Sequence, residues 1–82
     1  MDDDRRRYFR KPVNLRGIIR YGEASYELPC TITDLSLHGA GISLGTTFDV
    51  PQVFQLAIDG DLNIHHCRVA WSSGEKLGVA FE

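Results

Sequence analysis

Hydrophobic and polar residues alternate along most of the chain with a period of two, not the 3.6 of an amphipathic helix. In the first such segment, Leu15, Gly17, Ile19 and Tyr21 occupy every second position. The alternating segments are residues 15–21, 26–33, 40–44, 54–59, 62–71 and 77–81. No stretch of ten or more residues has helical periodicity, so the pattern predicts six short strands, each with one apolar face.

The spacing of these segments predicts how the strands are connected. Asp59-Gly60-Asp61 between two alternating segments is a strong hairpin signal. An open sheet of this size would expose both of its edges, and closure into a barrel removes them. We therefore predict an all-β fold, a small six-stranded antiparallel β-barrel over residues 13–82. A flexible N-terminal arm, residues 1–12, precedes it.

The length of 82 residues allows one modest core and excludes a catalytic cavity with a cofactor domain. No run of 18 apolar residues is present, which predicts that nothing spans a membrane. The N-terminus lacks the apolar region of a secretory signal, so we expect a cytoplasmic protein. Cys30 and Cys67 form no disulfide framework, and in a reducing compartment they are expected to be small buried apolar groups.

Charge is distributed very unevenly along the chain. The formal net charge is only −2, yet seven of the nine basic residues lie between residues 5 and 20, where there is no acidic residue. Residues 21–82 carry eight carboxylates against Arg68 and Lys76. This asymmetry indicates an anionic partner that binds the N-terminal segment.

The basic segment runs Arg5-Arg6-Arg7-Tyr8-Phe9-Arg10-Lys11-Pro12 and has no strand pattern of its own. The planar guanidinium of arginine can bridge phosphate oxygens, bind the O6/N7 edge of guanine or stack on a base. Taken alone, the segment is equally consistent with a solvated tail that the carboxylates of residues 2–4 partly neutralise.

A second candidate lies between two predicted strands, where Asp34, Ser36 and Gly39 are spaced i, i+2 and i+5. These residues would suit a tight connection, with side-chain oxygens capping N–H groups and Gly39 adopting a positive φ. They would also suit a ligand, because a carboxylate accepts hydrogen bonds from guanine N1–H and N2–H₂, and a hydroxyl with backbone N–H groups holds phosphate. The residues alone leave both interpretations open.

The two candidates together are more specific than either alone. Arg6-x-x-x-Arg10 followed by Asp34-x-Ser36-x-x-Gly39 resembles the signature of the PilZ domain family. The closing residues Leu77-Gly78-Val79-Ala80-Phe81 resemble the last barrel strand of that family, so the resemblance extends from Arg5 to Phe81. PilZ domains are small six-stranded β-barrels that act as receptors for the bacterial second messenger cyclic di-GMP.

The resemblance implies a role for each matched residue. Arg6 and Arg10 correspond to the arginines that contact ligand phosphates and guanines. The second motif, Asp34-x-Ser36-x-x-Gly39, would lie on the barrel surface facing the arm. Arg5 and Arg7 flank the motif as further phosphate contacts, and Trp71 is either an extra wall of the site or an aromatic of the core or rim. The candidate ligand-binding residues are Arg5, Arg6, Arg7, Arg10, Asp34, Ser36, Gly39 and Trp71. Cyclic di-GMP is the expected ligand, without other cofactor or metal.

The resemblance also suggests a mechanism. Ligand phosphates would replace the carboxylates of residues 2–4, the arm would fold across the barrel onto Asp34 and Ser36, and the ordered surface would bind a downstream protein effector. Many family members carry a C-terminal helix after the last strand. This chain stops at Glu82, so we expect no such helix or a minimal one.

Other functional classes have less support. Ser36 and His38 lack a third catalytic partner, so we expect no enzyme. The adjacent residues His65, His66 and Cys67 point to opposite faces of a strand, which disfavours a metal site. The alternatives are a small barrel that binds single-stranded nucleic acid or an acidic protein through its arm, and a PilZ-like interaction module without ligand. Nucleic acid is disfavoured because the body beyond residue 20 is acidic.

Overall fold

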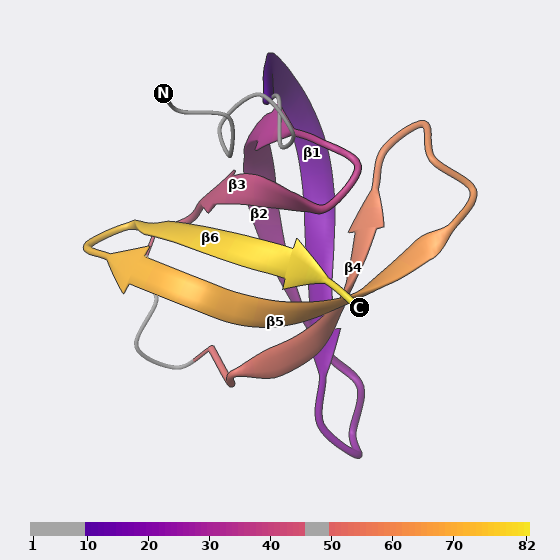
Figure 1. The fold of residues 1–82 in the computed structure, drawn as a ribbon. Coiled ribbons are helices and arrows are strands. Elements are labelled where there is room, and N and C mark those ends of the chain that lie inside the picture. The colour runs from indigo at the N-terminus through magenta and orange to yellow at the C-terminus, as the bar shows by residue number, and fades with distance from the viewer. Residues whose placement is uncertain (1–9, 46–49) are drawn as a thin grey trace.

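The computed structural model describes residues 10–45 and 50–82, and every regular element in these ranges is a strand. The strands are β1 (Lys11–Tyr21), β2 (Tyr26–Leu35), β3 (Gly39–Ser43), β4 (Val53–Ile58), β5 (Ile64–Ser73) and β6 (Lys76–Phe81). Neighbouring strands are antiparallel in the order β1-β2-β3-β6-β5-β4, and β1 also pairs with β4 (Figure 1). The predicted six-stranded antiparallel barrel is confirmed.

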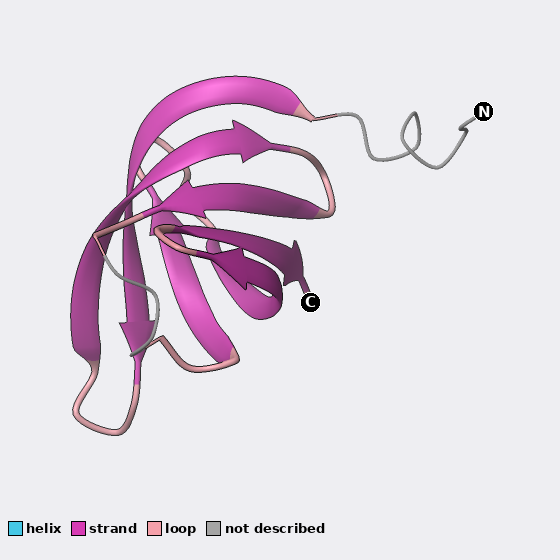
Figure 2. Ribbon diagram, turned by 90° about the vertical axis from the view of Figure 1, so that its left-hand side faces the viewer, coloured by secondary structure: helices cyan, strands magenta, loops and turns pink. Residues whose placement is uncertain are grey.

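The first strand begins earlier than its sequence pattern predicts. Lys11 and Pro12, which we assigned to the arm, pair with Leu35 and Asp34 of β2 and therefore belong to the barrel. A register shift between Pro12 and Leu15 interrupts the alternation, which is why periodicity alone does not detect this part of β1. The strands curve around one interior (Figure 2).

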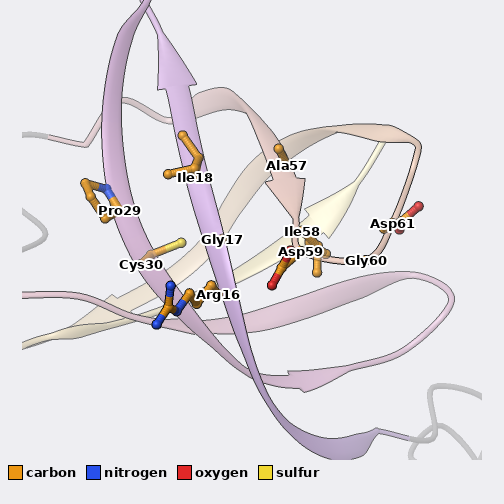
Figure 3. Close-up of a pocket in the computed structure, with 10 residues that line it drawn as sticks. All are labelled: Arg16, Gly17, Ile18, Pro29, Cys30, Ala57, Ile58, Asp59, Gly60 and Asp61. Atoms are coloured by element: carbon orange, nitrogen blue, oxygen red, sulfur yellow. The ribbon is translucent and has the colours of Figure 1, made fainter.

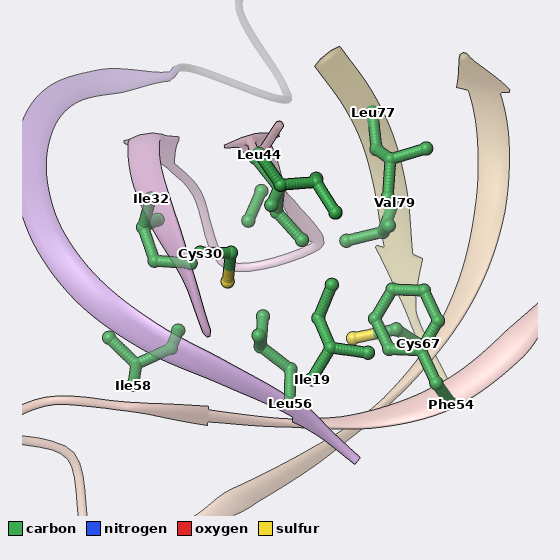
Figure 4. Close-up of a cluster of buried hydrophobic side chains, with 12 residues drawn as sticks. Ile19, Cys30, Ile32, Leu44, Phe54, Leu56, Ile58, Cys67, Leu77 and Val79 are labelled. Atoms are coloured by element: carbon green, nitrogen blue, oxygen red, sulfur yellow. The ribbon is translucent and has the colours of Figure 1, made fainter. Parts of the chain in front are cut away.

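That interior is filled by one side chain in two from every strand, as the period of two requires. Both cysteines are among these side chains, and burial raises the pKa of Cys30 to about 11 and that of Cys67 to about 12. They behave as the predicted small apolar groups. The buried residues are Ile19, Cys30, Ile32, Ala40, Ile42, Leu44, Phe54, Leu56, Ile58, Cys67, Leu77 and Val79 (Figure 4).

Two register shifts determine which side chains reach the outside of the barrel. In β2, Ile32 pairs with Ile42 and Asp34 with Gly41, so one extra residue lies between two pairs. In β5, Val69 pairs with Val79 and Trp71 with Gly78, again with one extra residue. In a regular strand, residues two positions apart point to the same face. The extra residue reverses this alternation, so the side chain two positions after an inward-facing residue points outward. This is how Asp34 and Trp71 come to lie on the surface.

The hairpin between β4 and β5 confirms the signal at residues 59–61. Gly60 has φ of +89°, a backbone conformation that favours glycine, and the Asp61 N–H donates to the Ile58 carbonyl over 2.9 Å. The Asp61 carboxylate then accepts a hydrogen bond from the Asn63 N–H at 2.9 Å and contacts His65 Nε2 at 2.8 Å. The turn is therefore held by its own side chains and not only by ladder hydrogen bonds.

Candidate functional site

The connection between β2 and β3 is closed by Ser36. Its N–H and its hydroxyl both donate to the Gly39 carbonyl, at 3.0 and 3.4 Å, and its Oγ accepts from the His38 N–H at 3.1 Å. Because the hydroxyl is engaged on both sides within the loop, Ser36 shapes the backbone here. The tight-connection interpretation of this segment is therefore correct for the Ser36 oxygen.

Gly39 is required at the start of β3 by its neighbour across the sheet. Its φ is not positive, contrary to our suggestion, and its backbone is buried against β6. A Cβ at this position would overlap the backbone carbonyl oxygen of Val79. The glycine thus allows two backbones to approach closely at one end of the candidate site.

Arg10 and Asp34 are in direct contact. The Arg10 Nη1 donates to the Asp34 Oδ1 over 3.0 Å, with the arginine side chain 45% and the carboxylate 28% exposed. The second motif arginine, Arg6, and its neighbours Arg5 and Arg7 lie outside the described residues. The contact joins the residue immediately before β1 to the end of β2, so the two sequence motifs meet at this point.

A row of paired residues crosses four strands on the outer face of the barrel. Asp34 pairs with Gly41, Gly41 with Gly78, and Gly78 with Trp71, from β2 through β3 and β6 to β5. A Cβ on Gly41 would overlap the Asp34 carboxylate, and a Cβ on Gly78 would overlap the Trp71 indole. The carboxylate and the indole therefore lean toward each other across two glycines. Trp71 is a surface residue, 46% exposed, and not part of the core.

A hollow of about 430 Å³ adjoins this row. Its polar lining comes from Arg10, Ser36 and His38, and its remaining lining from Gly39 and small or apolar residues of β5 and β6, Ala70, Val79, Ala80 and Phe81. The Phe81 N–H donates to the His38 carbonyl over 2.8 Å, which ties the end of β6 to the loop. The floor of the candidate site is therefore the outer face of Gly39, Gly41, Gly78 and Ala80. The Arg10 guanidinium and the Ser36 hydroxyl lie beside it, and the Trp71 indole lies over Gly78.

A larger hollow, about 610 Å³, lies elsewhere, at the β4–β5 turn (Figure 3). It is lined by Arg16 and by the two turn carboxylates Asp59 and Asp61, with apolar groups such as Ile18 and Pro29. Two carboxylates against one arginine repel a dianionic ligand. We therefore assign the candidate site to the smaller hollow, which is lined by Arg10, Ser36 and Gly39 of the two motifs, and to the row from Asp34 to Trp71 beside it.

Residues that sequence reasoning considered for other chemistry take structural roles. His65 stacks on Phe81 with ring centroids 4.3 Å apart, whereas His66 is exposed on the other face of β5. Within residues 10–45 and 50–82, no three His, Cys, Asp or Glu side chains gather as metal ligands would.

Comparison with known proteins bears directly on this site. Residues 4–82 match the family model of the PilZ domain. The chain belongs to the PilZ domain family. PilZ domains are non-catalytic receptor modules that typically bind cyclic di-GMP. A comparison with curated proteins gave no match.

Sequence reasoning missed the two glycines of the floor. Gly41 and Gly78 lie at outward positions of β3 and β6, where a strand normally carries a polar side chain. A glycine at an outward position of a strand indicates that another group lies close to the backbone there. This signal could have identified both glycines from the sequence.

Proposed function

We propose that this PilZ domain is a receptor for cyclic di-GMP, bound on the outer face of β2, β3, β6 and β5. The observation that carries the proposal is the row of paired residues from Asp34 to Trp71. The Asp34 carboxylate lies over Gly41, and the Trp71 indole lies over its neighbour Gly78. A planar ligand can stack on the Trp71 indole beside the Asp34 carboxylate, because both side chains lie low over the glycines. The adjoining Arg10 supplies positive charge beside it.

The chemistry of the walls suits a guanine nucleotide with phosphates. The Asp34 carboxylate accepts hydrogen bonds from guanine N1–H and N2–H₂, and the Arg10 guanidinium binds phosphate oxygens. Trp71 offers an indole face on which a base stacks. Gly39 allows β3 to pack closely on β6 beside the loop, and Ser36 keeps the loop in shape. Arg5, Arg6 and Arg7 add phosphate contacts in this proposal.

The N-terminal arm would close the site. The Arg10–Asp34 contact already brings the residue before β1 to the floor, so preceding residues have only a short distance to span. In this proposal the arm folds over the bound nucleotide, and the arm together with the ligand forms the surface that a downstream protein effector recognises.

The cellular setting follows from the same chemistry. Within the described residues no helix has the length and apolarity needed to cross a membrane. Cys30 and Cys67 are free thiols, which suits the reducing cytoplasm, where we place this receptor.

Calorimetric titration with cyclic di-GMP, GMP and single-stranded DNA tests the proposal. Binding of the cyclic dinucleotide alone, weakened by Arg10→Ala and by Ser36→Ala, is the expected result. Arg16→Ala and Arg20→Ala are matched controls, because both arginines lie on β1 away from the floor. If DNA binds as tightly, electrostatic attraction by the arm explains the data and the nucleic-acid alternative replaces the proposal. If no nucleotide binds, an interaction module without ligand replaces it.

A further inference from the structure

Arg68 lies on the far side of the floor from Arg10. It pairs across β5 and β6 with Ala80, and Ala80 pairs with Gly39 at the loop end of β3. Directly paired residues on one face of a sheet have Cβ atoms about 5 Å apart. Arg68 therefore stands next to the hollow that Ala80 and Gly39 line, on the side opposite Arg10.

The same strand presents the indole. Trp71 follows Arg68 by three residues, but their partners Ala80 and Gly78 are two residues apart on β6, roughly 7 Å of strand. The extra residue between Val69 and Trp71 places both side chains on the outer face. Without that bulge Trp71 would face the interior and Arg68 would stand alone. The β5 wall of the site consists of a stacking surface with a guanidinium at its side.

Arg68 is held weakly. Its Nε donates to Glu82 Oε2 over 2.7 Å, and the two side chains are 58% and 47% exposed. Among the described residues only this one hydrogen bond to the guanidinium is found, and it leaves the paired Nη groups without one. An exposed ion pair of this kind contributes little to stability, so a ligand can displace Glu82 at small cost.

We propose that Arg68 reads guanine in the bound ligand, an inference that rests on the cyclic di-GMP function proposed above. A base stacked on Trp71 presents its edge toward Arg68, and the guanidinium fork donates two hydrogen bonds to O6 and N7. Adenine carries an amino donor where guanine carries O6, so it cannot accept both. Arg68 thus discriminates between purines, and Glu82 holds its side chain aside until the ligand arrives.

The test measures the dissociation constants of cyclic di-GMP and cyclic di-AMP for the full chain by calorimetry. For Arg68→Gln we expect the preference for cyclic di-GMP to fall roughly ten- to hundred-fold, through loss of guanine binding. Arg68→Lys keeps the charge but not the fork, and we expect most of the same loss. Glu82→Gln frees the guanidinium, and we expect cyclic di-GMP to bind a few-fold more tightly.

Arg20→Gln is the matched control, because Arg20 also donates to a carboxylate, Glu27, at 2.8 Å and is 41% exposed, but lies on β1. Thermal melting of each variant checks that the barrel is intact. If wild type binds cyclic di-GMP and Arg68→Gln keeps the full preference, the role of Arg68 is overturned and the receptor function stands. Equal loss in Arg68→Gln and Arg20→Gln also overturns it. If wild type binds no cyclic di-GMP, both proposals fail.

Discussion

At the scale of single residues, the outward-facing glycines of this barrel allow neighbouring side chains to lie directly on the strand backbone. Gly41 and Gly78 form the floor only because the side chains of Asp34 and Trp71 occupy the space above them. Gly39 serves a different purpose, since its neighbour is a backbone carbonyl that cannot move aside. The same residue type thus lies under covering side chains at two positions and allows backbone packing at a third.

Gly78→Ala tests the floor. The added methyl group overlaps the indole, so we expect Trp71 to leave its position and affinity for cyclic di-GMP to fall about tenfold through lost stacking. Trp71 is the sole tryptophan, and its fluorescence will report the displacement even without ligand. Gly45→Ala is the control, because a Cβ there meets no atom of the described part of the chain within 4 Å. An unchanged emission spectrum in Gly78→Ala would contradict the packing described here.

The turn carboxylate Asp61 predicts a pH dependence. Hydrogen bonds from the His65 side chain and then the Asn63 backbone hold the pKa of Asp61 below its ordinary value of 3.8. Because the folded state lowers this pKa, the stabilisation is present above about pH 4 and is lost as the pH falls through the folded-state value. Urea unfolding should show wild type more stable than Asp61→Asn at pH 6, and the difference should shrink at pH 3. A difference that is equal at both values would exclude this role.

At the scale of elements, the decisive features are the bulges in β2 and β5. Each inserts one residue, and that residue turns the end of its strand so that a side chain meets the glycines from outside. The β2–β3 loop then fixes the far end of the floor through the hydrogen bonds of Ser36 and the contact between Phe81 and His38. Strand pairing and loop closure together position the site.

Gly39→Ala tests the junction of loop and strand. A Cβ there overlaps the Val79 carbonyl, so β3 and β6 must separate locally, and we expect destabilisation of about 1–3 kcal/mol. For a domain of this size, each kcal/mol lowers the melting temperature by about 4–8 °C. Differential scanning calorimetry measures the shift, again beside Gly45→Ala. A melting temperature within 2 °C of wild type would show that the strands accommodate the methyl group.

At the scale of the whole molecule, a single small core supports a candidate site on the barrel surface, and Val79 belongs to both. Among the described residues, twelve buried apolar side chains form one cluster, while Arg10, Asp34 and Trp71 lie outside it. A domain this small has a free energy of unfolding of only about 4–12 kcal/mol. The proposed binding function would therefore depend on a core with little stability to lose.

Leu56→Ala tests that dependence. Leu56 is a fully buried member of the cluster, and truncation should cost about 2–5 kcal/mol through lost burial and the cavity that remains. Leu62→Ala is the matched control, because Leu62 is completely exposed in the β4–β5 turn, and we expect a change within about 0.5 kcal/mol. Chemical denaturation of both variants gives the comparison, and equal losses would contradict the assigned core.

The sequence by itself determined the six strands, the hairpin at residues 59–61 and the buried cysteines, because alternation and turn chemistry are local. It also carried the Asp34 and Ser36 motif and the resemblance to PilZ domains. It misplaced the start of β1, because the register shift after Pro12 breaks the local pattern.

Only the tertiary structure decided how these pieces form a surface. The side on which Asp34 and Trp71 lie depends on bulges, and the place of Arg68 beside the hollow depends on its partner Ala80 in another strand. Pairing register is set by contacts between residues distant in the chain, and one inserted residue reverses every side chain beyond it. Periodicity along the chain cannot show which strand contains the inserted residue. The candidate site could therefore be located only from the strand pairing of the closed barrel.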